Sequence, residues 1–326
     1  MEKESTSGAS SVETVSLRIL NEILQYRRKP GSALSAAEEE KIITEIQLPV
    51  IKQFVEKNET VQFVLPAFPT KSPNPSKVLG KRPDMGERLS LIFLNSLCQR
   101  IQFYYPPGAH IKICSDGHVF SDLIRVSDED INVYQKDIEN IFNEIGAAHL
   151  SVFNLGDVEE MARHLDDYNQ LRHLLVENYA TSQDELKQQL TASEDGLQLY
   201  RAIIRFMYED GMTPDYTGSH AALQKDAKQR ACGVIQRSWA WGNLLKKIFP
   251  HAVRLSIHPQ PAASQKIGIH MLPTRDSWLT PWHAVAVKTP DRFVLMKREE
   301  AEQLGGNLVK INGVPSHYEI SSLETA

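Results

Sequence analysis

The sequence predicts an α/β protein, with a layered N-terminal domain on a largely parallel sheet, a helical middle and a smaller α+β part at the C-terminal end. Three observations support this prediction. Short apolar segments alternate with helical patterns between residues 60 and 154. Residues 157–249 follow a helical pattern almost throughout, and short strand-like segments resume after Pro250.

Three strands and two helices are expected in the N-terminal half. The strands are predicted at residues 60–65, 110–114 and 149–154, which are short and mostly apolar. A helix should begin at Asp84, because Glu87 follows three residues later and an apolar face comes after it. A second helix should begin after Ser127 and end at Gly146. This alternation is typical of a Rossmann-like layered domain.

The chain of 326 residues is longer than a typical domain of roughly 100–200 residues. Residues 1–12 are rich in serine and glutamate, and we expect them to be disordered. A Rossmann-like α/β domain is predicted over residues 13–195, followed by a helical and β-containing C-terminal subdomain over residues 196–326. Strands of this subdomain are predicted at residues 253–257, 268–272, 282–289 and 292–297.

Composition excludes several classes of protein. The 41 acidic residues outnumber the 36 lysines and arginines, so no basic surface for nucleic acid is expected. No apolar run approaches the roughly 20 residues that span a bilayer, and the polar N-terminus is no signal peptide. The three cysteines are too few and too scattered for a disulfide framework. We expect a soluble cytoplasmic protein with neither nucleic acid nor membrane as a partner.

A polar, proline-rich loop follows the first predicted strand. It carries Lys71, Ser72, Asn74 and Lys77, two ammonium groups and two neutral hydrogen-bonding side chains within seven residues. Lysine supplies charge and short polar side chains supply direction, so this combination suits a phosphate group. A solvated loop with surface lysines explains the same residues equally well.

A second polar cluster follows the strand at residues 110–114. Ser115, Asp116 and His118 surround Gly117, which permits an unusual turn. A hydroxyl, a carboxylate and an imidazole placed close together can move protons. A capped turn in which Ser115 and Asp116 satisfy loop amides explains the same spacing.

Arginines recur on the faces of two predicted helices. Arg205 lies on one helix, and Arg230 and Arg237 lie on the next. Guanidinium groups on a helix face can bind an anionic substrate. Surface ion pairs with neighbouring carboxylates are the commoner reason for such arginines.

Histidines recur in the C-terminal segments. His258 shares a polar strand face with Arg254, and His270 and His283 stand in similar segments. None forms a tight pair such as HxH or HExxH, so no metal is expected. The sequence has neither a GxGxxG after its first strand nor a P-loop, so no nucleotide cofactor is expected.

Six blocks of unusual composition resemble one known family. They are LPAFPTKSPNPSKVLGKRPD, PPGAHIKICSDGHVFSD, RFMYEDG, RSWAWGNLL, RLSIHP and TPWHAVAV. These blocks are similar to the pyoverdine/dityrosine biosynthesis family, whose bacterial members include the isonitrile synthases. The likeness runs over roughly residues 55 to 300, and blocks this long are improbable by chance.

The resemblance implies a reaction in which the α-amine of an aromatic amino acid, tyrosine or tryptophan, condenses with the C2 carbonyl of ribulose 5-phosphate. Proton transfers and carbon–carbon cleavage then leave one sugar carbon as the isonitrile, with no redox cofactor. The resemblance also implies a functional partner, an iron and 2-oxoglutarate dependent oxygenase that consumes the product. Two alternatives remain open at this stage: a family member that forms N-formyl tyrosine, and a non-catalytic module that binds phosphosugars.

Roles for individual residues follow from the implied reaction. The substrate-binding set would be Lys71, Ser72, Asn74, Arg205, Arg230, Arg237, His258, His270 and His283. Ser115, Asp116 and His118 would move protons around the imine. A lysine, either Lys77 or Lys71, would form a Schiff base with the ketose unless the substrate amine attacks directly.

Overall fold

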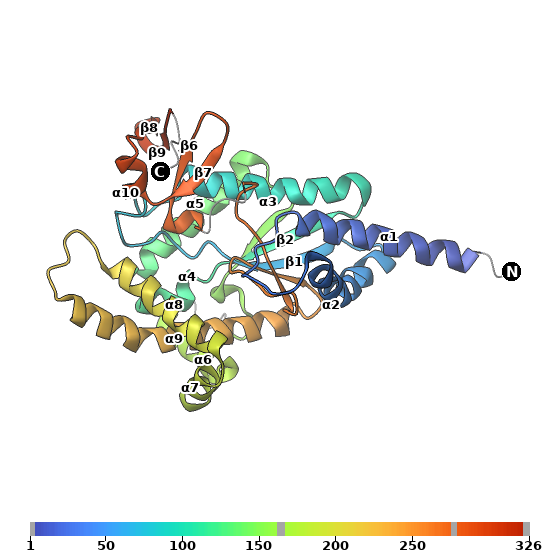
Figure 1. Cartoon of the computed structure of the whole chain (residues 1–326), viewed down its shortest axis with the longest axis horizontal. Helices are drawn as coiled ribbons and strands as arrows, with labels where there is room; N and C mark the ends of the chain where they lie inside the picture. The colour runs from blue at the N-terminus through green and yellow to red at the C-terminus, as the bar shows by residue number, and fades with distance from the viewer. Residues whose placement is uncertain (1–3, 162–166, 275–278, 322–326) are drawn as a thin grey trace.

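The computed structural model describes residues 4–161, 167–274 and 279–321. Its centre is a parallel sheet of five strands in the order β3-β2-β1-β4-β5. The strands are β1 (Val61–Pro66), β2 (Ala109–Cys114), β3 (Leu150–Phe153), β4 (Val253–Ser256) and β5 (Lys266–Gly268). Figure 1 shows β1 and β2 between α3 above and α9 below, so the α/β class predicted from the sequence is confirmed.

Helices cover both faces of this sheet. The helices of the described residues are α1 (Glu4–Leu24), α2 (Ala36–Glu56), α3 (Met85–Tyr104), α4 (Gly117–Ile124), α5 (Asp128–Ile145), α6 (Tyr168–Tyr179), α7 (Gln183–Thr191), α8 (Glu194–Gly211), α9 (His220–Ile248) and α10 (Arg298–Gln303). On one face Phe63 and Ile111 pack against α1, α2, α3 and α5. On the other face Val64 and Cys114 pack against Trp241 and other residues of α6 and α9. Alternate strand residues therefore enter two separate cores.

The helix boundaries predicted from local sequence are confirmed. Asp84 caps α3 in a capping box with Glu87, and the hydroxyl of Ser127 accepts a hydrogen bond from the backbone of α5. Gly146 ends α5 with a φ of 62°, the left-handed conformation that glycine adopts without strain. Helix α3 follows the polar loop after β1 and α5 follows α4, so the cap of α3 fixes where that loop ends.

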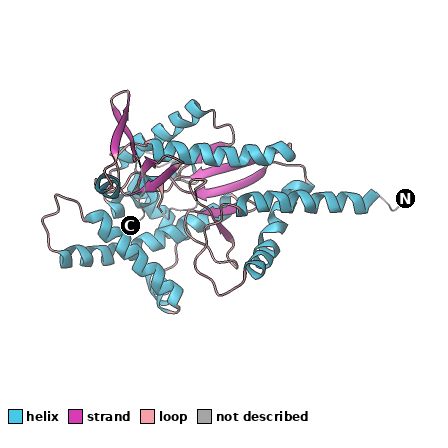
Figure 2. Ribbon diagram, turned by 45° about the horizontal axis from the view of Figure 1, so that its top comes forward, coloured by secondary structure: helices cyan, strands magenta, loops and turns pink. Residues whose placement is uncertain are grey.

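Two predictions about organisation need correction. Strands β4 and β5 were assigned from the sequence to the C-terminal subdomain, but they pair with β1 and extend the first sheet. Residues 4–12 were expected to be disordered, whereas α1 begins at Glu4, and Figure 2 shows this helix extending away from the body of the molecule. These polar residues are helical because they form the first turns of α1, and the apolar stripe later in that helix packs in the core. Residues 1–3 lie outside the described part of the chain.

The segment after β2 also differs from the turn that was expected. Helix α4 begins directly at Gly117, which packs so closely on the preceding loop that an added Cβ would lie 2.2 Å from the carbonyl oxygen of Pro69. Glycine is required here for this close approach rather than for an unusual turn. The consequence is that Asp116 stands at the N-terminal end of a helix at the edge of the sheet.

A second, smaller sheet completes the C-terminal part. Its strands, in the order β7-β6-β9-β8, are β6 (Val285–Lys288), β7 (Phe293–Met296), β8 (Asn307–Ile311) and β9 (Val314–Glu319). The strand predicted at residues 282–289 is shorter than expected, because Pro281–His283 forms a 3-10 turn before β6. This turn brings His283 back toward the first sheet. No described helix is long and apolar enough to cross a membrane.

Candidate active site at the carboxyl edge of the parallel sheet

The polar loops identified from the sequence meet where the parallel strands end. Asp116 follows β2 by two residues, His258 follows β4 by two, and the loop with Lys71 and Lys77 follows β1. Because all five strands run parallel, these ends lie along one edge of the sheet. Ligands of open α/β sheets bind at this edge.

Lys71 lies at the centre of a buried ion cluster. Its Nζ is 2.8 Å from carboxylate oxygens of both Asp84 and Glu87 and 3.0 Å from the carbonyl oxygen of Pro281, and its side chain is fully buried. Burial acts to lower the pKa of Lys71, but the two carboxylates outweigh it and the pKa is raised. Burial raises the pKa of Glu87 to about 7. The cluster ties the loop after β1 to the start of α3, so the charge of Lys71 is compensated within the protein.

The other polar residues of this loop converge on the end of α8. Asp210 Oδ1 accepts hydrogen bonds from Ser72 Oγ at 2.8 Å and from Lys77 Nζ at 2.6 Å. The side-chain amide of Asn74 donates to the carbonyl oxygens of Glu209 and Met212. Asp210 thus organises the loop, although sequence reasoning did not single it out. Its signal was the acidic pair in RFMYEDG, which was noted only as part of a family likeness.

His283 approaches the same carboxylate from the C-terminal part. Its Nδ1 lies 3.9 Å from Asp210 Oδ2, and its ring meets Phe206 edge-on at 4.8 Å between ring centres. Burial lowers the pKa of His283 to about 4, and the cations Lys77 and Lys71 add to this effect. The imidazole is therefore neutral at pH 7 and retains one hydrogen-bond acceptor and one donor.

His258 follows β4 at the carboxyl edge of the sheet. Its side chain is exposed to solvent, yet surrounding protein lowers its pKa to about 4, with the charges of Arg28 and Lys266 acting in the same direction. The imidazole of His258 is therefore neutral at pH 7, like that of His283.

Asp116 is the carboxyl group with the most unusual environment. Its Oδ1 is buried and has no hydrogen-bond partner within the described residues, and its side chain does not cap α4. Burial raises the pKa of Asp116 to about 7. Its neighbour Ser115 is fixed, since its hydroxyl donates to the carbonyl oxygen of Phe68 and accepts from Gln135. A carboxyl group that titrates near neutral pH and has a free oxygen can both give and take a proton.

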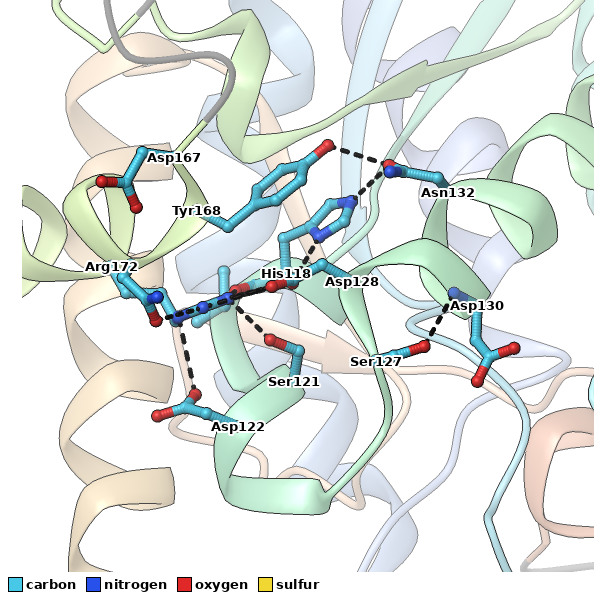
Figure 3. A network of polar contacts seen from close by, with 12 residues as sticks. His118, Ser121, Asp122, Ser127, Asp128, Asp130, Asn132, Asp167, Tyr168 and Arg172 are labelled. Atoms are coloured by element: carbon cyan, nitrogen blue, oxygen red, sulfur yellow. Dashed lines mark hydrogen bonds and ion pairs between the residues drawn. The ribbon is translucent and has the colours of Figure 1, made fainter.

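His118 lies in a network of polar contacts between α4, α5 and α6 (Figure 3). Its ring nitrogens lie 3.0 Å from Asp128 and 3.0 Å from Asn132, and the ring stacks on Tyr168 with centres 3.8 Å apart. Arg172 binds Asp128 and the carbonyl oxygen of His118. Burial lowers the pKa of His118 despite the carboxylate. Both ring nitrogens are thus engaged in holding three helices together.

The predicted arginines all have acidic neighbours in the structure. Arg205 is exposed and pairs with Glu209, Arg230 pairs with Asp226, and Arg237 pairs with Asp122. These contacts match the ion-pair explanation that the sequence left open. His270 is buried next to β5, where its backbone N–H donates to the carbonyl oxygen of Tyr26. Arg205 is linked to the cluster around Asp210 through Glu209, whose carboxylate lies 3.7 Å from Lys77 Nζ.

A search of protein families matches residues 51–309 to the model described as pyoverdine/dityrosine biosynthesis protein. The chain belongs to this family. The L-tyrosine isonitrile synthase of Xenorhabdus nematophila is 62% identical over 312 residues, covering 95% of this chain and 93% of the relative. The L-tyrosine isonitrile synthase of Pseudomonas aeruginosa is 60% identical, with 96% of each chain covered. Every site residue described above lies inside the family match.

Two further comparisons place the chain within the family. The L-tryptophan isonitrile synthase AmbI1 of Fischerella ambigua is 41% identical and covers 94% of this chain and 95% of its own length. The crystal structure of the PvcA protein from Pseudomonas aeruginosa superposes with a TM-score of 0.91 at 60% identity, over 94% of this chain and all of that one. The fold described here is therefore the fold of this family.

Proposed function

We propose that this chain is a cytoplasmic L-tyrosine isonitrile synthase, which joins the α-amine nitrogen of tyrosine to a carbon of ribulose 5-phosphate. Tyrosine is favoured over tryptophan because relatives named for tyrosine are 60% and 62% identical, whereas those named for tryptophan are 41% identical. The single observation that carries a catalytic role is Asp116, whose unpaired carboxyl oxygen lies at the sheet edge. The product would pass to a separate iron and 2-oxoglutarate dependent oxygenase.

The proposed chemistry needs a group that gives and takes protons while the amine condenses with the C2 carbonyl and the C1–C2 and C2–C3 bonds of the sugar are cleaved. With a pKa of about 7, Asp116 is present in both protonation states at neutral pH. The neutral imidazoles of His258 and His283 would hydrogen-bond substrate hydroxyl groups. Ser115 would act by holding the backbone before Asp116, since its own hydroxyl is already bonded.

Direct attack by the tyrosine amine is favoured over a Schiff base with an enzyme lysine. Lys77 pairs with Asp210 at 2.6 Å, and Lys71 is held by two buried carboxylates. An ammonium nitrogen has no lone pair with which to attack a carbonyl. We expect borohydride to leave both lysines unmodified when it is added with ribulose 5-phosphate alone. Peptide mass analysis checks this, and a reduced sugar adduct on either lysine would establish the covalent route instead.

Incubation with ribulose 5-phosphate and either tyrosine or tryptophan tests the proposed function. In the presence of a chelator, we expect tyrosine to yield a product with the infrared stretch of an isonitrile, at a higher kcat/KM than tryptophan. A formamide product would place the chain with the N-formyl tyrosine alternative. Sugar-phosphate binding without any turnover would favour the non-catalytic module.

A further inference from the structure

A row of three cations crosses the α9 face of the parallel sheet. The strand register pairs Lys112 with Val64, Val64 with Arg254, and Arg254 with Lys266, on four neighbouring strands. Residues in one such row point to the same face. Val64 identifies that face, because it packs in the core formed by α6 and α9. Arg254 and Lys266 therefore lie next to each other, on strands about 4.8 Å apart.

The charges of this pair are not compensated within residues 4–161, 167–274 and 279–321. Arg254 donates from Nη2 to the carbonyl oxygen of Gly242 at 3.1 Å, and neither Arg254 nor Lys266 forms an ion pair there. Both are partly buried. Burial lowers the pKa of each, and for Lys266 the charge of Arg254 adds to the effect. Like charges side by side destabilise a sheet, so the fold tolerates a repulsion here that a bound anion would relieve.

The pair adjoins the candidate active site. Arg254 lies two residues before the carboxyl end of β4 and His258 follows that end by two residues, so the pair is near the sheet edge that carries the site. The polar loop after β1 offers no comparable excess of charge. Lys71 there has two carboxylate partners, and Lys77 is bonded to Asp210. The uncompensated positive charge of the site is thus on β4 and β5 rather than on the lysine-containing loop.

We propose that Arg254 and Lys266 bind the phosphate group of the phosphorylated substrate. This assignment rests on the proposed function, which supplies a sugar phosphate. Two adjacent cations match the two charges of a phosphate monoester, whereas a carboxylate would leave one cation uncompensated. A guanidinium group can donate two parallel hydrogen bonds to phosphate oxygens while the ammonium group contributes charge.

Calorimetric titration with inorganic phosphate, without turnover, tests the pair directly. We expect Lys266→Met and Arg254→Gln each to weaken phosphate binding about 10- to 100-fold, the loss typical of one charged hydrogen bond. Lys247→Met is the matched control, because it removes one positive charge from an exposed lysine of α9 that pairs with Glu160. Its phosphate affinity should stay within about twofold of the wild type. Unchanged affinity in Lys266→Met and Arg254→Gln would overturn the proposal.

Steady-state kinetics then distinguish phosphate from carboxylate. The same variants should raise the KM for ribulose 5-phosphate by a similar factor and leave the KM for tyrosine unchanged. A selective rise in the KM for tyrosine would assign the pair to the amino-acid carboxylate and contradict the proposal. Phosphate affinity that depends on Arg254 in a protein without synthase activity would uphold the site and reject the proposed function.

Lys266→Met should also raise Tm in phosphate-free buffer, which verifies that the variant folds. If Arg254→Gln does not fold, Arg254→Lys, which keeps the charge and loses the paired donors, replaces it.

Discussion

Asp116→Asn is expected to lower kcat with tyrosine and ribulose 5-phosphate by about 10²- to 10⁴-fold, the usual contribution of a general acid or base. The substitution preserves the shape of the side chain and removes its titration. In the wild-type protein kcat should change with a pKa near 7, and this inflection should disappear in the variant. The pH dependence of kcat for both proteins provides the measurement.

The same substitution has an opposite effect on stability. The pKa of Asp116 is raised by burial to about 7 in the folded protein, above its value of about 3.9 in the unfolded chain. The folded state therefore loses stability as the pH rises from about 4 to about 7, because burying the carboxylate is costly. Asp116→Asn should melt at a higher temperature than the wild type at pH 8, with little difference at pH 4.

A matched control separates loss of the acid from loss of charge in general. Asp184→Asn removes a carboxylate whose side chain is 98% exposed, so kcat should stay within about twofold of the wild type. Full turnover by Asp116→Asn would assign the proton transfers to another group. Turnover absent from the wild type, together with intact sugar-phosphate binding, would favour the non-catalytic module.

Lys71→Met is expected to destabilise the folded protein by about 3–5 kcal/mol, the cost of leaving a buried charge without its partner. Asp84 and Glu87 would remain together without the ammonium group between them. Their repulsion would raise the pKa of Glu87 further, so the loss should be larger at pH 8 than at pH 5. Urea denaturation at the two pH values measures the change in the free energy of unfolding.

Two comparisons show whether this loss comes from the buried charge. Lys81→Met removes an exposed lysine that pairs with Asp130, and it should cost less than about 1 kcal/mol. The triple variant Lys71→Met, Asp84→Asn, Glu87→Gln should recover part of the stability because no charge is left buried. A stable Lys71→Met protein with a higher KM for ribulose 5-phosphate would return Lys71 to the phosphate-binding role predicted from the sequence.

Features encoded in neighbouring residues were predictable from the sequence. The caps at Asp84, Ser127 and Gly146 depend on residues three or four positions apart, and all three are present. The pairing of β4 with β1 depends on residues about 190 positions apart, and no local pattern marks it. For this reason β4 was predicted but its place in the first sheet was missed, and the strand expected at residues 268–272 overlaps β5 at Gly268 alone.

The same difference between local and long-range contacts explains which features of the candidate site could be predicted from the sequence. Asp116 was identifiable because it directly follows a predicted strand. The partners of Lys71 and Lys77 were not, since Asp84 and Glu87 lie at the start of α3 and Asp210 lies at the end of α8. His118 was grouped with Asp116 as if both lay in one turn. Because a helix turns by about 100° per residue, two positions place His118 on the far side of α4, where it contacts Asp128.

The central claim is that the nitrogen of tyrosine becomes bonded to C2 of the sugar phosphate in this site. Incubation of the enzyme with [¹⁵N]tyrosine and [2-¹³C]ribulose 5-phosphate, followed by NMR of the product, tests it most directly. We predict an isonitrile whose ¹³C carbon is coupled to ¹⁵N, formed by the wild type and not by Asp116→Asn. An unlabelled isonitrile carbon, or label found only in a formamide, would contradict this account.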